Sequence, residues 1–359
     1  MKKRIDAHMH ISQWFLPNGQ TSFEVLEQYQ KDNHIEHVAN MCCTNNANLW
    51  NGYELDQCMI AAVCKFLNPS AYIYGCLVIP DTSADVKIPD EISFENQAAH
   101  LMEIGFDGIK CCDFKPDAFK LYEVEKRLDD YEKYFAYCEK HDIPMCWHVS
   151  DPQTFWDASQ VPQWAKQANW FYGHPSYPTY EHLYELTYGF LDRHPKLRVM
   201  LAHAFFLSEN PNEVITLFEK YPNVTLDLAP GWEMFDGFRK HYDAWYHIFR
   251  QYSDRILYAT DATMSTGLAY VDSLAQNVYR FLTTADTFEV PGNYVAHGIQ
   301  LEDAHLDRIL CNNFKRIAGD SPKELHLGAL KRYFDTYLPF MPDSQNKQQL
   351  ANFYRKNLL

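Results

Sequence analysis

Short apolar runs, each closed by polar or titratable residues, recur along this chain of 359 residues. Continuous apolar runs of roughly four to eight residues are typical of parallel strands that are buried on both faces. Strands are predicted at residues 4–10, 37–43, 71–79, 107–112, 143–149, 198–204, 224–229 and 255–260. The hydrophobic pattern therefore predicts a sheet of eight buried strands.

Segments with helix signals separate several of these strands. They cover residues 21–31, 94–104, 131–141, 180–193 and 212–220. Gly105 and the pairs His194-Pro195 and Tyr221-Pro222 give stop signals at three of the helix ends. Alternating strands and helices predict parallel strands with right-handed crossovers, and eight units over about 310 residues predict one closed (β/α)8 TIM barrel.

Two connections of this barrel are long. One spans residues 150–180 after the fifth strand and is rich in aromatic residues, and the other includes residues 283–298 after the eighth. Long loops at the active face of such a barrel usually shape a pocket or act as a lid. We expect residues 1–320 to form the barrel domain. Residues 321–359 are expected to form a C-terminal helical extension packed on it, starting at Ser321-Pro322-Lys323-Glu324.

Titratable residues close four of the predicted strands. The first strand ends in Asp6-Ala7-His8-Met9-His10, and the fifth, sixth and eighth lead to His148, His203 and Asp261. On a strand, the spacing of His8 and His10 puts both imidazoles on one face. The carboxyl ends of barrel strands meet at one mouth, and a catalytic zinc needs about three protein ligands and an open position. The sequence therefore predicts a metal site at this mouth.

Charge and the absence of long apolar runs narrow the expected partners. The formal net charge of −15 argues against nucleic acid and anionic membranes as partners. No apolar run approaches the roughly 20 residues of a membrane span, and polar residues from Asp6 to His10 interrupt any signal-peptide pattern. We expect a cytoplasmic protein that acts on a small molecule and forms a homo-oligomer, with a dimer favoured.

The series of motifs resembles the amidohydrolase superfamily of metal-dependent TIM barrels. It is most similar to the amidohydrolase-related branch, which also contains aminocarboxymuconate-semialdehyde decarboxylase and related non-oxidative decarboxylases. The resemblance covers most of the chain and rests on residues 6–10, 105–110, the strand of His148, 194–203, 221–229 and 255–261.

This resemblance implies a set of site residues. His8, His10, His148 and Asp261 would be the metal ligands, and Asp261 would also accept a proton from the metal-bound water. His203 would bind a second metal or polarise the substrate. The expected cofactor is a divalent metal ion, zinc first and manganese second, with one ion per chain favoured over two.

Other positions keep more than one interpretation. Lys110 could carry a carbamate that bridges two metals, bind an anion, or be structural. Trp232 and Glu233 follow the seventh strand and are candidate substrate contacts, while Asp227, inside that strand, could equally support a metal ligand.

Two reactions fit these parts. The first is hydrolysis of an amide, lactone or ester bond in a small molecule by a metal-activated water. The alternative is a metal-dependent non-oxidative decarboxylase, a carbon–carbon lyase, acting on a small carboxylic acid, for which Lys110 and Lys115 are the only cationic hints. A barrel without catalysis would show a broken ligand set, whereas the set here is intact.

Overall fold

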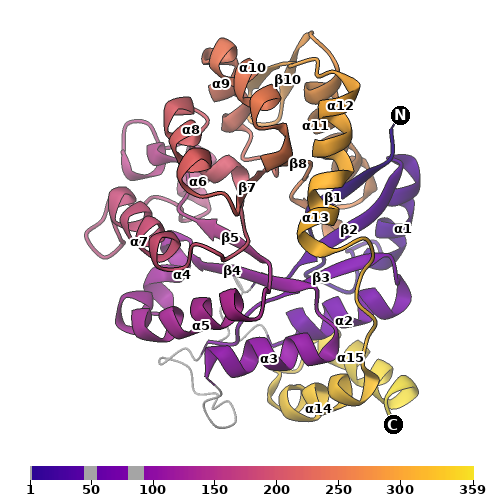
Figure 1. The fold of residues 1–359 in the computed structure, drawn as a ribbon. Coiled ribbons are helices and arrows are strands. Elements are labelled where there is room, and N and C mark those ends of the chain that lie inside the picture. Colours follow the sequence, from indigo (N-terminus) through magenta and orange to yellow (C-terminus); the bar gives the residue numbers. More distant parts are fainter. Residues whose placement is uncertain (1, 44–54, 80–92) are drawn as a thin grey trace.

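The computed structural model describes residues 2–43, 55–79 and 93–359, and its main element is a curled parallel sheet (Figure 1). Neighbouring strands pair in the order β8-β7-β6-β5-β4-β3-β2-β1-β9. The strands are β1 Arg4–His10, β2 Ile35–Met41, β3 Ala71–Gly75, β4 Gly108–Phe114, β5 Met145–Val149, β6 Val199–Leu201, β7 Val224–Asp227, β8 Ile256–Leu257 and β9 Ala262–Thr263. This order follows the chain, as expected when each strand is joined to the next by a crossover.

The sheet closes through the segment between β8 and β9. The Ala7 N–H donates to the Tyr258 carbonyl at 3.0 Å, and the Asp261 N–H donates to the His8 carbonyl at 2.9 Å. Ala262 then pairs with Met9. β8 and β9 are thus two pieces of the predicted eighth strand, and they contact both β7 and β1. The (β/α)8 TIM barrel predicted from the sequence is confirmed.

Helices surround the barrel (Figure 1). They are α1 Ser22–Asp32, α2 Gln57–Leu67, α3 Phe94–Ile104, α4 Pro116–Leu121, α5 Leu128–Lys140, α6 Gln163–Gln167, α7 Tyr180–Arg193, α8 Pro211–Lys220, α9 Glu233–Lys240, α10 Tyr242–Gln251, α11 Leu268–Thr283, α12 Asp303–Asp307 and α13 Asn313–Ala318. The five predicted helices are present. Thr21 begins α1 with a capping box closed by Glu24, and Gly105 ends α3 in the left-handed region with φ of 107°.

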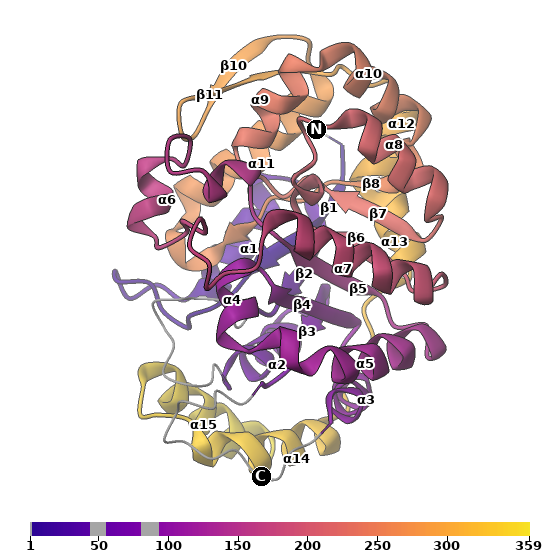
Figure 2. The ribbon, with the colours of Figure 1, turned by 90° about the vertical axis from the view of Figure 1, so that its left-hand side faces the viewer.

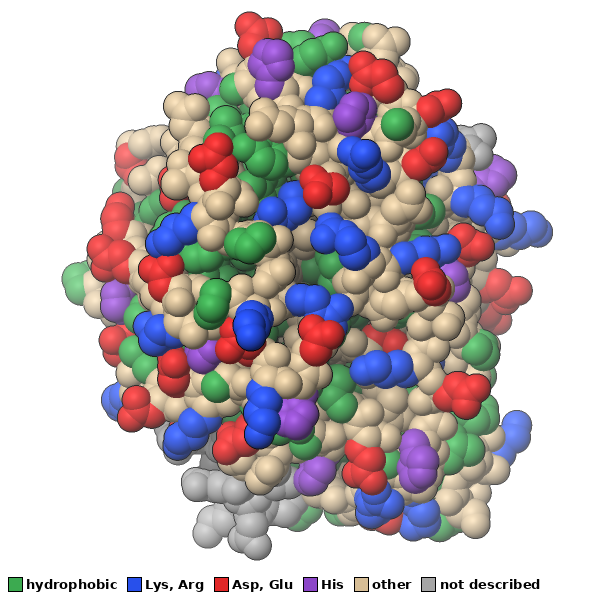
Figure 3. Space-filling view, in the orientation of Figure 1, with side chains coloured by type: hydrophobic (Ala, Val, Ile, Leu, Met, Phe, Trp, Pro, Cys, Tyr) green, Lys and Arg blue, Asp and Glu red, His purple; other side chains and the backbone are tan. Residues whose placement is uncertain are grey.

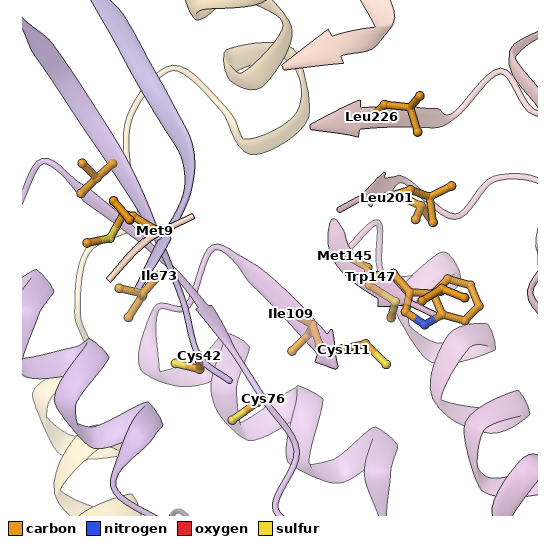
Figure 4. Close-up of a cluster of buried hydrophobic side chains, with 14 of the residues drawn as sticks. Met9, Cys42, Ile73, Cys76, Ile109, Cys111, Met145, Trp147, Leu201 and Leu226 are labelled. Carbon is orange, nitrogen blue, oxygen red and sulfur yellow. The ribbon is translucent and has the colours of Figure 1, made fainter. Parts of the chain in front are cut away.

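Alternation along the strands divides the core into two layers. One set of side chains, including Ile5, Met41 and Cys146, forms a buried cluster inside the barrel. The other set, including Met9 and Trp147, belongs to a larger cluster shared with the helices, part of which Figure 4 shows. The β1–β2 register shifts between Asp6 and Met9, so Ile5 and Met9 lie on opposite faces although they are four residues apart. On either side of the outward Met9, His8 and His10 lie on the inner face.

The C-terminal segment forms α14 Leu327–Tyr337 and α15 Gln345–Asn357, which lie beside α3 and α2 (Figure 2). The first helix of this segment starts at Leu327, after the predicted start of the extension at Ser321. The Lys323 N–H donates to Asp107 Oδ1 at 2.8 Å, and the His326 N–H donates to the Ile104 carbonyl at 2.9 Å. These bonds hold the segment against the barrel before His326 caps α14.

On the surface, positive and negative side chains are interspersed over the face drawn in Figure 3. In the described ranges no helix combines the length and apolar character needed to cross a bilayer.

The predicted loop at 283–298 contains an antiparallel hairpin of β10 Thr287–Val290 and β11 Tyr294–His297, which was not predicted from the sequence.

Candidate metal centre

The two histidines of β1 present the same ring nitrogen to the barrel mouth. His8 Nδ1 donates to Asp227 Oδ2 at 2.8 Å, and His10 Nδ1 donates to the Met41 carbonyl at 2.6 Å. Each bond places a ring proton on Nδ1, so that Nε2 is the nitrogen that each ring would offer to a metal. A hydrogen bond of this kind to a carboxylate or carbonyl is the usual support of a metal-bound histidine. Asp227 therefore lies where a partner of a metal ligand is expected.

The Nε2 atoms of these rings converge with the carboxylate of Asp261. The two Nε2 atoms are 3.1 Å apart, and Asp261 Oδ1 lies 3.0 Å from that of His10 and 3.6 Å from that of His8. Ligands at about 2.0–2.1 Å from a tetrahedral ion are separated by about 3.3 Å. Two imidazoles and one carboxylate without sulfur suit zinc or manganese. The residues present therefore fit the expected divalent ion.

His148 and His203 form a second pair at the mouth. His203 Nε2 lies 3.1 Å from His148 Nδ1, and His203 Nδ1 lies 2.9 Å from the Ala229 carbonyl. The His203 ring is 5.4 Å from that of His8, measured between ring centres. His148 points to His203 and Ser150, and it does not join the close group of His8, His10 and Asp261. Its role as a metal ligand stays a prediction.

Burial and neighbouring charges set the protonation of these groups. Burial and the Lys110 charge hold the pKa of His8 well below its usual range. Burial and the His148 charge lower the pKa of His203 to about 4. Burial alone would raise the pKa of Asp261, but the hydrogen bond from His10 and the charges of His203 and His8 hold it well below its usual range. Although burial favours the neutral form of His10, the hydrogen bond to Asp261 and the Asp261 charge raise its pKa. At neutral pH, His8 and His203 are therefore neutral beside the ionised Asp261, and His10 is the imidazole that holds a proton most strongly.

Lys110 lies beneath this group and not in the open cavity. Its side chain is buried in β4, and Nζ donates to His8 Nε2 at 3.0 Å and to Cys146 Sγ at 3.4 Å. Cys146 also forms a fully buried cluster with His8 and Asp227, and the sequence analysis did not select it. The only available signal was its position opposite Lys110 in the predicted parallel register. The carbamate, anion-binding and structural roles of Lys110 stay predictions.

A cavity of about 570 Å³ opens beside the site. It is lined by Lys115, His148, Asp151, Pro152, Phe155, Trp164, Trp170, His203, Phe206, Pro230, Gly231, Trp232, Glu233, Asp261, Tyr270, Pro291 and Gly292. Trp232 and Glu233 thus reach the place expected for substrate contacts. The long loop after β5 supplies Phe155, Trp164 and Trp170, so it shapes the pocket as predicted.

An ion pair that the sequence analysis did not recognise lies at the edge of this cavity. Lys115 Nζ is 2.5 Å from Asp151 Oδ2 and 3.5 Å from Asp117 Oδ1, and it donates to the Tyr172 hydroxyl at 2.8 Å. Asp151 follows the fifth strand in the same way that Asp261 follows β8, which was the available sequence signal. Although burial favours its neutral form, the Lys115 charge lowers the pKa of Asp151 to about 2.

Comparison with known families identifies the chain. The family model described as Amidohydrolase matches residues 5–317, which include every candidate site residue described above. The chain belongs to the amidohydrolase family. This membership supports an enzyme with hydrolase or related activity, and together with the donor set it supports a divalent metal.

Solved structures share the fold at low sequence identity. An uncharacterized TIM-barrel protein from Bordetella bronchiseptica is 14% identical with a TM-score of 0.52, over 88% of this chain and 98% of that one. IDCase from Metarhizium anisopliae, in apo form, is 12% identical with a TM-score of 0.53, over 88% and 97%. An amidohydrolase from Burkholderia multivorans with bound zinc is 11% identical with a TM-score of 0.50, over 89% and 100%. No curated protein matches the sequence.

Proposed function

We propose that this protein is a metal-dependent hydrolase that cleaves an amide, lactone or ester bond of a small molecule. The observation that carries the proposal is the convergence of His8 Nε2, His10 Nε2 and Asp261 Oδ1 within 3.6 Å of one another at the cavity. A divalent ion held by such ligands lowers the pKa of a bound water from 15.7 to about 7.

Three residues of the chain have separate roles in the proposed reaction. Asp261 is ionised and lines the cavity, so it can accept a proton from the attacking water and return it to the leaving group. His203 is neutral at neutral pH and its Nδ1 donates to the Ala229 carbonyl, so its Nε2 can orient a substrate by accepting a hydrogen bond from an N–H or O–H group. Asp227 holds His8 in the tautomer that leaves Nε2 available.

The charge of the cavity favours hydrolysis over decarboxylation. The metal would bind the carboxylate of a decarboxylase substrate, and an available cationic side chain would help to hold it. Among the described residues that line the cavity, Lys115 is the only lysine or arginine, and it is paired with Asp151 and Asp117. Lys110 is buried against His8.

A substrate panel on metal-loaded protein tests the proposal. Lactones, esters, N-acyl compounds and aromatic carboxylates are assayed for hydrolysis and for release of carbon dioxide. Asp261→Asn should lower the hydrolytic rate by about 10²–10⁴, because asparagine cannot accept the proton. Metal content is measured alongside, and the exposed Asp129→Asn serves as the matched control.

Two results would contradict the proposal. One is carbon dioxide release from a carboxylate without hydrolysis of any other compound, which would indicate the lyase. The other is near-full turnover by Asp261→Asn at full metal occupancy, which would remove Asp261 from proton transfer.

A further inference from the structure

Aromatic side chains from separate loops form the walls of the cavity. The six are Phe155, Trp164, Trp170, Phe206, Trp232 and Tyr270. Trp164 is 44% exposed and Tyr270 is 45% exposed, whereas Phe155 is 2% exposed. Walls of this kind bury large flat surfaces, and each aromatic contact adds stabilisation beyond the buried area. The cavity therefore suits a flat, apolar group.

Lys115 cannot offer its charge to a substrate without losing buried partners. Its Nζ is shared by Asp151, Asp117 and the Tyr172 hydroxyl, and it lies 4.3 Å from the centre of the Trp170 ring. Breaking a buried ion pair is strongly destabilising, because it leaves an uncompensated buried charge. An anionic group in the cavity would also approach the negative charge of Asp151. The described lining therefore disfavours an anion away from the metal site.

Glu233 has a different environment from the other acids of the cavity. Among the described residues, no other side chain forms a hydrogen bond or ion pair with its carboxyl group, which contacts its own backbone N–H. The carboxyl group occupies the space where a side chain on Gly231 would lie. Burial raises the pKa of Glu233 to about 7, with a smaller contribution from the Asp151 charge. A neutral carboxyl group is a hydrogen-bond donor. Glu233 is therefore an uncommitted polar group on an otherwise aromatic wall.

We propose, on the basis of the hydrolase function above, that this cavity selects a substrate with a flat apolar group, and no anionic group, next to the cleaved bond. The aromatic wall holds that group, and Glu233 binds a neutral polar substituent on it. Selectivity against an anion follows because Lys115 is already paired and the other acids of the lining repel an anion.

A matched series of ligands tests this selectivity. Acetanilide is neutral, para-acetamidobenzenesulfonate carries a negative charge that binds metals weakly, and para-acetamidophenyltrimethylammonium carries a positive charge. Binding to the metal-loaded protein is measured by calorimetry. Acetanilide should bind at least about tenfold more tightly than the sulfonate, whereas the ammonium analogue should keep most of the affinity because aromatic faces and carboxylates attract cations. Equal or tighter binding of the sulfonate, or an equal loss of affinity with the ammonium analogue, would overturn the proposal.

Variants place the binding on the aromatic wall. Trp232→Ala should weaken acetanilide binding about tenfold, and Trp164→Ala, at the exposed rim, should weaken it less. Glu233→Gln should keep the preference for the neutral ligand, because glutamine also presents an uncharged donor. Phe340→Ala is the control, since Phe340 is 38% exposed outside the cavity. Circular dichroism checks each fold, and unchanged binding in both tryptophan variants would overturn the proposal.

Turnover is recorded separately from binding, so the two proposals fail in different ways. Preference for acetanilide without hydrolysis of any panel compound would contradict the hydrolase function and support the selectivity. Hydrolysis confined to anionic compounds would support the hydrolase and overturn the selectivity.

Discussion

Non-glycine residues with positive φ mark the strand ends that carry the site. Ser150 has φ of 67°, Asp261 has φ of 55°, and each residue of the turn from 203 to 206 has φ between 50° and 58°. Such conformations cost about 1–3 kcal/mol each and persist only where the surroundings hold them. Asp227 Oδ1 accepts the His203 N–H at 2.8 Å and so holds the start of this turn. These strained conformations direct the side chains of His203, Phe206 and Asp261 towards the cavity at the barrel mouth.

The spacing of residues predicted part of this arrangement. His8 and His10 could be placed on one face because a strand alternates, and Asp261 could be placed beside them because the last strand closes on the first. The pairing of His148 with His203 could not be predicted, because it depends on the turn after β6. The pattern of hydrophobic and polar positions does not indicate a run of residues with left-handed backbone conformation.

A buried acid of β4 should give stability a distinct pH dependence. Asp113 accepts a hydrogen bond from Tyr131 at 2.9 Å, and burial raises its pKa from 3.8 to about 7. The folded state therefore binds this proton more tightly than the unfolded state. Its contribution to the free energy of unfolding is present below about pH 4 and is lost as the pH rises through about 7.

Asp113→Asn cannot ionise, so its free energy of unfolding relative to wild type should improve between about pH 4 and pH 8. Urea unfolding at several pH values measures this difference, with the exposed Asp129→Asn as the control. Parallel pH profiles for wild type and Asp113→Asn would show that Asp113 is not the source.

The strands were predicted better at their starts than at their ends. β6 ends at Leu201 and β8 at Leu257, earlier than the apolar runs suggested, because the chain turns into the site there. The β10–β11 hairpin was missed, although residues 287–290 alternate between exposed and buried and precede Pro291-Gly292. That pattern is a recognised hairpin signal. Residues 283–298 were instead predicted to form a single loop.

The aromatic loop at 150–180 should depend on its Lys115 anchor. Lys115→Met leaves Asp151 as an unpaired buried charge, which costs about 3–5 kcal/mol. We expect a lower midpoint of thermal unfolding and faster proteolysis within the loop. The double variant Lys115→Met/Asp151→Asn should recover much of the loss, because it removes both charges. A double variant that is as unstable as the single one would contradict this role of the ion pair.

At the scale of the whole molecule, the closed barrel followed from counting alternating units. The sequence did not reveal that the eighth strand has two pieces, because Tyr258 and Asp261 form their bonds with a segment about 250 residues away. Solved barrels with 11–14% identity keep the same fold. Such conservation of shape at low identity fits a core defined by alternation and volume. Function then depends on the residues at the mouth.

The metal content and ligand set of purified protein test the central claim most directly. Wild type, His10→Ala and the control His182→Ala, whose exposed ring bonds to Glu125, are stripped by chelation and reloaded with zinc or manganese. Elemental analysis and X-ray absorption should find about one ion per chain with nitrogen and oxygen ligands in wild type and His182→Ala. Binding should be lost or strongly weakened in His10→Ala, with the fold retained. A wild type that takes up no metal, or a His10→Ala variant that binds it as tightly, would contradict the account.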